Sequence, residues 1–112
     1  FVGLGTTTPQ QKLVVKGDIA TDGTAPSLSS CGTSPAISAG STDTAGVVTE
    51  GSIATGCVIT FATAKANAPF CVVESDAGVA FTKSVSATAI TITNIGALSS
   101  TGITYVCIDN GR

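Results

Sequence analysis

Histidine and tryptophan are absent from this chain of 112 residues, tyrosine occurs once, and only 11% of the residues are charged. Without histidine, a nucleophilic side chain lacks its commonest general base, and a zinc site would need four isolated cysteine thiolates to converge. Glycoside hydrolysis needs two carboxylates beside a cleft that aromatic rings usually line, and aromatic residues are scarce here. We therefore predict that the domain is not an enzyme and that it uses no metal and no cofactor.

The charged residues that are present form no cluster. Five basic and seven acidic residues give a net charge of -2, and the lysines are scattered along the chain. Nucleic acid is not an expected partner, because phosphate binding needs a concentrated basic face. The sequence contains no run of about 18 apolar residues, which a membrane-spanning helix would need. Small uncharged residues replace the charged ones and leave little repulsion between copies, so the composition suits permanent assembly.

Apolar residues alternate with a period of two in several short segments, and none has the 3.6-residue period of a helix over three turns. Turn-forming residues separate these segments, for example at residues 76–78, 94–96 and 110–111. Strands are expected at residues 46–49, 53–62, 70–74, 79–85, 89–95 and 103–108. Six short strands at intervals of roughly ten residues indicate an all-β, antiparallel β-sandwich of jelly-roll type.

The first 19 residues follow a different pattern. Gly3 and Gly5 flank one apolar residue, and three threonines with Pro9 favour an extended path. Leu13 and Val15 then alternate with Lys12, Val14 and Lys16, which predicts a short strand with one apolar face. The residues alone leave two alternatives open: a strand packed on the domain that follows, or a strand packed on other copies. A phosphate loop is excluded by the missing third glycine and helix.

This spacing resembles the shaft signature G-[IL]-G-T-x-x-P-x-x-K-L-x-V-x-G-x-I of bacteriophage tail fibres and related trimeric surface fibres. The matching residues are Gly3, Leu4, Gly5, Thr6, Pro9, Lys12, Leu13, Val15, Gly17 and Ile19. The resemblance implies a homotrimer in which Leu4, Leu13, Val15 and Ile19 face the partner chains. Residues 30–109 are similar to a head module of phage and environmental fibre proteins. Phe1 enters the signature directly, so we expect a piece of a longer polypeptide.

The expected organisation has three parts. Residues 1–21 form a shaft and trimerisation element, and residues 22–40 form a connecting segment without strong periodicity, whose later half lies across the head. Residues 41–112 form the sandwich head.

Four cysteines at spacings of 26, 14 and 36 residues allow three disulfide connectivities. In a tight hairpin around residue 66, Cys57 and Cys71 would be out of register. We therefore favour Cys31 with Cys57 and Cys71 with Cys107, with buried thiols in the same positions as the alternative. Disulfides are typical of extracellular proteins, and a virion surface is the expected location.

The functional prediction is a fibre fragment that presents exposed loops to a host surface. Glu74 and Asp76 could share a cation or a sugar hydroxyl, but Asp76 precedes a glycine and is more simply a turn former. The expected partners are two further copies, other virion or fibre proteins, and a host glycan or protein. The alternatives are a bacterial adhesin or filament subunit, and a carbohydrate-binding module or glycan hydrolase. The loop residues predicted to face a receptor are Ser41, Asp43, Asp76, Gly78, Ser99 and Thr101.

Overall fold

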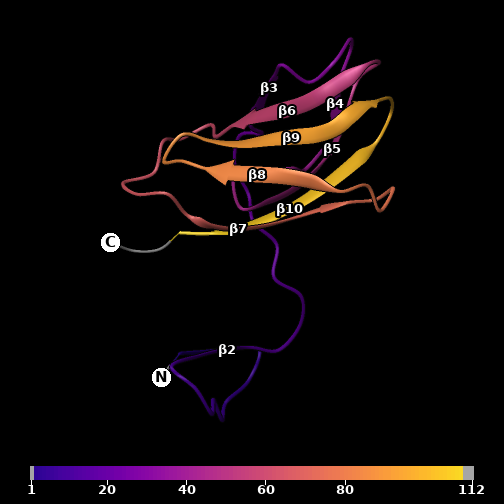
Figure 1. Cartoon of the computed structure of the whole chain (residues 1–112). Helices are drawn as coiled ribbons and strands as arrows, with labels where there is room; N and C mark the ends of the chain where they lie inside the picture. Colours follow the sequence, from indigo (N-terminus) through magenta and orange to yellow (C-terminus); the bar gives the residue numbers. More distant parts are fainter. Residues whose placement is uncertain (1, 110–112) are drawn as a thin grey trace.

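The computed structural model has ten β-strands in the part of the chain that it describes (Figure 1). None of the described residues forms a helix long and apolar enough to cross a membrane. That part is residues 2–109, without the side chains of residues 95–98. The strands are β1 (Val2–Leu4), β2 (Leu13–Val15), β3 (Ser27–Ser29), β4 (Ala36–Ile37), β5 (Ala45–Thr49), β6 (Ala54–Thr60), β7 (Phe70–Ser75), β8 (Phe81–Val85), β9 (Ala89–Leu98) and β10 (Gly102–Ile108).

Eight of these strands form two antiparallel sheets, ordered β4-β5-β10-β7 and β3-β6-β9-β8. Burial alternates along β7 and β10, so every second side chain points to the core. One cluster of buried residues combines Val48, Ile103 and Tyr105 from the first sheet with Ile59, Ile90 and Ile92 from the second. The predicted all-β, antiparallel architecture is thereby confirmed.

Both favoured disulfides are present. Cys31 is bonded to Cys57, and Cys71 is bonded to Cys107, which leaves no free cysteine. Cys71 and Cys107 are directly opposite each other in the β7–β10 pairing, so their side chains point to the same face of the sheet. Two closed disulfides indicate an oxidising, extracellular environment.

The segment predicted as a connection contributes two strands to the head. β3 pairs with β6, and β4 pairs with β5, while Pro26 is already buried. These strands have only three and two residues, which is too short for an alternating pattern to be visible in the sequence. The sheets of the head therefore begin at Ser27, before the predicted boundary at residue 41.

The turn predicted at residues 94–96 lies inside a strand. β9 continues to Leu98, and the chain turns only at residues 99–101. Opposite this stretch the pairing with β6 shifts register between Ala54 and Gly56, so the turn-forming residues produce an irregularity in a longer strand. The turn predicted at residues 110–111 lies outside the described residues.

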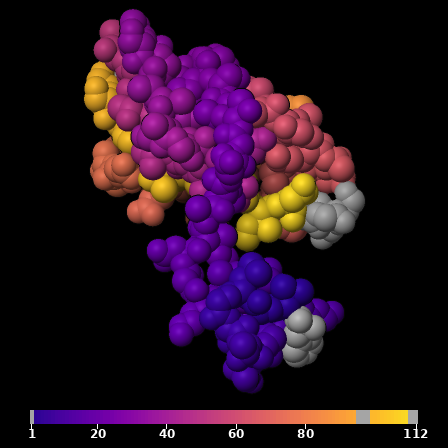
Figure 2. Space-filling view, turned by 180° about the vertical axis from the view of Figure 1, so that it is seen from behind, coloured from indigo at the N-terminus to yellow at the C-terminus, as the bar shows by residue number. Residues whose placement is uncertain are grey.

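Residues 2–16 form a separate unit. β1 and β2 pair in parallel with each other only, and the amide of Lys16 donates to the carbonyl oxygen of Leu4 at 2.9 Å. A Cβ on Gly3 would lie 2.5 Å from the carbonyl oxygen of Thr6, so the loop closes only around glycine. From behind, a single purple segment joins this indigo unit to the head (Figure 2). The predicted strand at Leu13 is present, and β1 was not predicted.

Candidate functional site

The loops predicted to face a receptor lie at two opposite ends of the head. Asp76 and Gly78 follow β7, and Ser99 and Thr101 precede β10, so these four residues share one end of the sheets. The amide of Asp76 donates to the carbonyl oxygen of Gly102 at 2.8 Å, which holds the two turns together. The loop with Ser41 and Asp43 precedes β5 and lies at the other end. Ser41 and Thr101 are buried, whereas Asp76, Gly78 and Ser99 are exposed.

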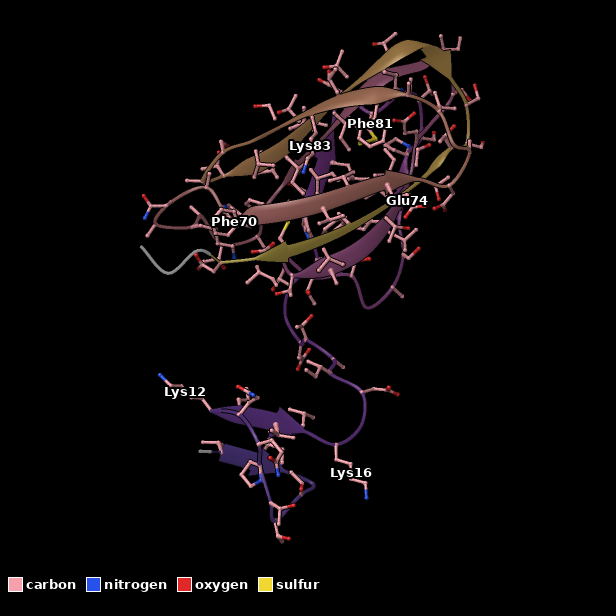
Figure 3. The ribbon with its side chains drawn as sticks, turned by 60° about the horizontal axis from the view of Figure 1, so that its bottom comes forward. Lys12, Lys16, Phe70, Glu74, Phe81 and Lys83 are labelled. Carbon is pink, nitrogen blue, oxygen red and sulfur yellow. A yellow bond between two sulfur atoms is a disulfide. The ribbon has the colours of Figure 1, made fainter. Side chains whose placement is uncertain are left out.

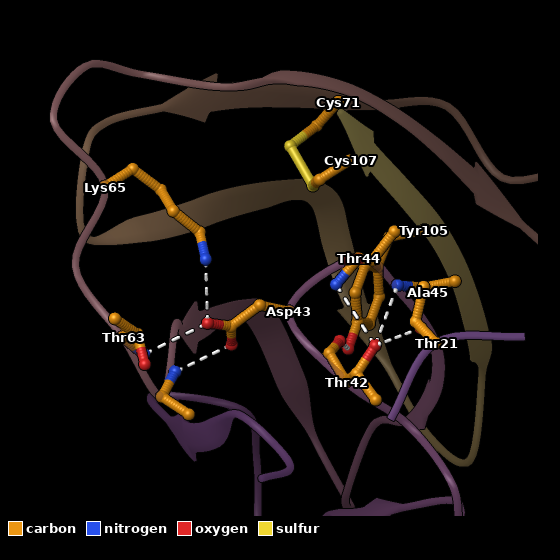
Figure 4. A network of polar contacts seen from close by, with 11 residues as sticks. Thr21, Thr42, Asp43, Thr44, Ala45, Thr63, Lys65, Cys71, Tyr105 and Cys107 are labelled. Atoms are coloured by element: carbon orange, nitrogen blue, oxygen red, sulfur yellow. Dashed lines mark hydrogen bonds and ion pairs between the residues drawn. A yellow bond between two sulfur atoms is a disulfide. The ribbon is translucent and has the colours of Figure 1, made fainter. Parts of the chain in front are cut away.

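Asp43 organises the end at which the N-terminal segment reaches the head (Figure 4). Its carboxylate accepts hydrogen bonds from the amides of Ala62 at 2.7 Å and Thr63 at 3.0 Å, and pairs with Lys65 Nζ at 3.0 Å. Partial burial alone would raise the pKa of the Asp43 carboxyl. The two amide hydrogen bonds and Lys65 outweigh burial and lower that pKa.

The neighbouring loop residues are also fully engaged. Tyr105 Oη donates to the carbonyl oxygen of Thr42 at 2.5 Å, and burial, with the nearby Asp43 charge, raises the pKa of Tyr105 to about 12. Thr42 Oγ1 accepts from the amide of Thr44 at 3.2 Å and lies 2.7 Å from Thr21 Oγ1 (Figure 4). The contact between Thr21 and Thr42 attaches the N-terminal segment to the head, so we call this end the anchor.

A polar pocket of about 360 Å³ opens beside the anchor. It is lined by Asp22, Gly23, Thr24, Thr42, Asp43, Thr44, Ala62, Thr63 and Lys65. The charged groups of Asp43 and Lys65 are directed at each other, so the pocket offers mainly threonine hydroxyls and Asp22. It contains no nucleophile with an adjacent base, which acyl or glycosyl transfer would need.

The opposite end of the head concentrates backbone strain. Ser30, Ser34, Ile53 and Ser100 are the non-glycine residues with positive φ among those described, and all belong to this end. The amide of Gly51 donates to the carbonyl oxygen of Cys31, Thr33 and Ser52 exchange two hydrogen bonds, and the amide of Ile53 donates to Ser99 Oγ. We call residues 30–34, 51–53 and 99–100 together the strained end.

Ile53 is the least expected residue of the strained end. Its φ is +55°, a conformation that β-branched residues very rarely adopt, and its side chain is 75% exposed. Neither burial nor local preference therefore explains an isoleucine here. Non-glycine residues in such conformations persist only where the surrounding structure holds them, and they concentrate at functional sites.

A buried polar pair holds the turn that carries Ile53. Glu50 is only 2% exposed, and both of its carboxylate oxygens accept from Asn94 Nδ2, at 3.2 and 3.0 Å. The same nitrogen donates to the carbonyl oxygen of Ala54 at 3.3 Å, so Asn94 joins both ends of the turn. Burial raises the pKa of the Glu50 carboxyl, and the hydrogen bond from Asn94 opposes that shift only in part. The pair fixes the turn beneath Ile53.

Chemically, the strained end offers contact surface. Exposed Ile53 shares this end with the hydroxyl-bearing residues Thr33, Ser34, Ser52, Ser99 and Ser100, and its amide donates to Ser99 Oγ. Among the described residues, no group of three or more cysteine or acidic residues is placed to hold a metal ion. The sequence predicted Ile53 as the start of a strand. The turn before Ile53 contains Gly51, where a Cβ would lie 2.1 Å from the carbonyl oxygen of Thr33, so the close approach of these two residues requires glycine.

Comparisons with protein-family models, with curated proteins and with solved structures found no match to this chain.

Proposed function

We propose that this chain is part of a trimeric fibre of a phage tail or similar virion appendage, and that it presents a small β-sandwich head for attachment to a host surface. The observation that carries the proposal is the unit of residues 2–16, which combines the fibre-like spacing with apolar side chains that its own chain does not cover. The work of the domain is structural, and no catalytic step is assigned to it.

The N-terminal unit needs partner chains for physical reasons. Val2, Leu4 and Leu13 are 55%, 55% and 58% exposed, and Ile19 beyond β2 is 77% exposed. An isolated pair of strands is at best marginally stable in water, and this pair has only three residues on each side. Three copies around one axis would cover the apolar side chains and leave no open sheet edge.

Recognition is assigned to the strained end of the head. This end lies at the opposite end of the strands from the anchor formed by Asp43 and Thr42, where the N-terminal segment enters. Its turns are joined by hydrogen bonds to rigid strands, which is the usual arrangement of binding loops on a scaffold. Ser99 belongs to this end and Asp76 borders it, and both were predicted to face a receptor, while Ile53 adds an exposed apolar side chain.

Mass measurement of the assembled chain tests the trimer. Native mass spectrometry should return three times the chain mass of 10.9 kDa. Leu13→Asp should dissociate the assembly, because it places a charge on the predicted contact between copies. Gln11→Asp, at an exposed position of the same unit, is the matched control and should remain trimeric. A monomer or a dimer from the parent chain would contradict the proposal.

A further inference from the structure

One face of the head carries an exposed apolar surface that no described part of the chain covers. Phe70 and Val72 of β7 are 62% and 73% exposed, and Val106 and Ile108 of β10 are 46% and 66% exposed. The register places Val72 opposite Val106 and Phe70 opposite Ile108, so the four side chains are contiguous on the outer side of the β4-β5-β10-β7 sheet. We call these four residues the apolar face.

The apolar face has charged groups at its border, among them the Lys83 ammonium at the β7 edge and the Asp76 carboxylate, which accepts from Thr104 Oγ1. Glu74 lies at its border, two residues beyond Val72 on β7 and opposite Thr104, and Figure 3 shows it at the other end of the strand from Phe70. On the other side, Ala45 and Val47 of β5 continue the surface, because Ala45 pairs with Val106 and Val47 with Thr104. The largest apolar patch on a soluble protein is often a site of interaction.

The apolar face is uncovered, whereas one carbonyl at the β7 edge of the sheet is already bonded. β7 is the last strand of its sheet, which normally invites pairing with a strand from another molecule. Lys83 Nζ, on β8 of the other sheet, donates to the carbonyl oxygen of Cys71 and so occupies that edge (Figure 3). Because this contact interferes with strand addition at Cys71, we expect a partner to pack on the side chains of the face.

The short linker to the N-terminal unit and the small area of the apolar face indicate that another copy of the chain covers this face. Thr21 is bonded to the head at Thr42, so only residues 16–20 separate β2 from the head, and they span at most about 18 Å. A trimer joined through residues 2–16 would hold its three heads at an effective concentration of the order of millimolar. The apolar face would bury only a few hundred Å² per copy, well under the roughly 800 Å² per partner of a free-standing stable interface. Such a weak contact forms between tethered copies and hardly between separate molecules.

We propose that the apolar face is a second self-contact surface, covered by the heads of the other copies in the assembled trimer. This inference rests on the proposed trimer and extends it from the N-terminal unit to the head. A shallow hollow of about 320 Å³ borders Val106 and is lined by residues of the 38–47 segment and of β10. In a threefold ring each contact joins two different surfaces of the chain. The hollow is large enough for a bulky side chain from a neighbouring copy.

The experiment places a photoreactive benzoylphenylalanine at position 72 of the full chain, and at position 82 in the control. Thr82 is exposed on β8, the edge strand of the other sheet, so it matches Val72 in exposure and strand position. We expect crosslinks between copies from position 72 and none from position 82. Both chains are first checked for intact disulfides and a β-sheet circular dichroism spectrum.

The outcomes separate the inference from the proposed function. A trimeric mass without crosslinks from position 72, or with equal crosslinks from both positions, would overturn the self-contact and leave the trimer standing. A monomeric parent chain without crosslinks would overturn both. Crosslinks from position 72 in a chain that is not trimeric would support the self-contact and overturn the trimer. A second variant, Val72→Lys, should lower the midpoint of thermal dissociation of the trimer, whereas Thr82→Lys should leave it unchanged.

Discussion

At the residue scale, Ile53 joins two properties that rarely coincide, an exposed apolar side chain and a left-handed backbone. A left-handed conformation costs an L-residue roughly 1–2 kcal/mol, and glycine avoids that cost but loses more chain entropy on folding. Selection for stability alone would therefore not favour isoleucine at this position.

Ile53→Gly should raise the free energy of unfolding by up to about 1 kcal/mol, because the strain is removed. Thr82→Gly, at an exposed position of β8 in regular register with Thr93, should lower the free energy of unfolding by about 0.5–1 kcal/mol, because glycine costs chain entropy in an ordinary strand. Urea denaturation of the two variants and the parent measures both effects. Equal destabilisation by both changes would show that Ile53 is not strained.

The buried carboxyl of Glu50 should make the free energy of unfolding depend on pH. Folding raises the pKa of its carboxyl above the usual 4.5, so the folded state favours the protonated form. The stabilising contribution of that form is complete below pH 4.5 and is lost as pH rises through the raised pKa. Glu50→Gln stays uncharged, so its free energy of unfolding should equal that of the parent near pH 4 and exceed it increasingly toward pH 7. Asp18→Asn, in the exposed segment after β2, controls for the loss of one charge.

Denaturation curves between pH 4 and pH 8 give this comparison. A Glu50→Gln variant that is less stable than the parent at every pH would contradict it. In that case the hydrogen bonds from Asn94 would be worth more than the cost of burying the charge.

At the element scale, the two disulfides hold different kinds of structure. Cys71–Cys107 joins two strands that are already paired along six positions, whereas Cys31–Cys57 holds the short strands β3 and β4 on the head. Strands of two or three residues contribute few hydrogen bonds of their own. Their attachment therefore depends on the covalent bond.

Replacing both Cys31 and Cys57 by alanine should speed amide hydrogen exchange in residues 27–37 selectively, with a loss of about 2–4 kcal/mol in the free energy of unfolding. The matched pair Cys71→Ala and Cys107→Ala should have a similar total cost without the local effect. Exchange followed by mass spectrometry separates the cases. Uniformly faster exchange in the first variant would refute the assignment.

At the scale of the whole molecule, three weak contacts should act together. If each copy of the strained end binds a host surface weakly, the trimer gains avidity that a single chain lacks. Simultaneous substitutions at Ile53, Asp76 and Ser99 should therefore abolish binding of the trimer to host cells or to arrayed host glycans, and substitutions at the exposed residues Asp22 and Thr44 near the anchor should not. Undiminished binding, or glycan turnover that is lost on Glu74→Gln or Asp76→Asn, would contradict the proposal.

The sequence by itself determined the strand class and most strand positions. These depend on local period-two alternation and on turn residues, which a chain displays directly. Hairpin register argued only against pairing Cys57 with Cys71, and the favoured pairing, one of the two that remained, is present. The strands that were not predicted, β1, β3 and β4, have only two or three residues, which is too few to display a period of two clearly.

Only the tertiary structure decided which loops share an end of the head and which residues carry strain. Asp43 and Asp76 look alike in the sequence, because both lie in turn-forming stretches, yet Asp43 holds the amides of Ala62 and Thr63 at one end of the head and Asp76 borders the strained end at the other. Ile53 lies in its left-handed conformation because Ser99, Asn94 and Thr33, distant in the chain, hold the turn around it. Long-range hydrogen bonds of this kind leave no local pattern, since they arise from how two sheets and their turns are brought together.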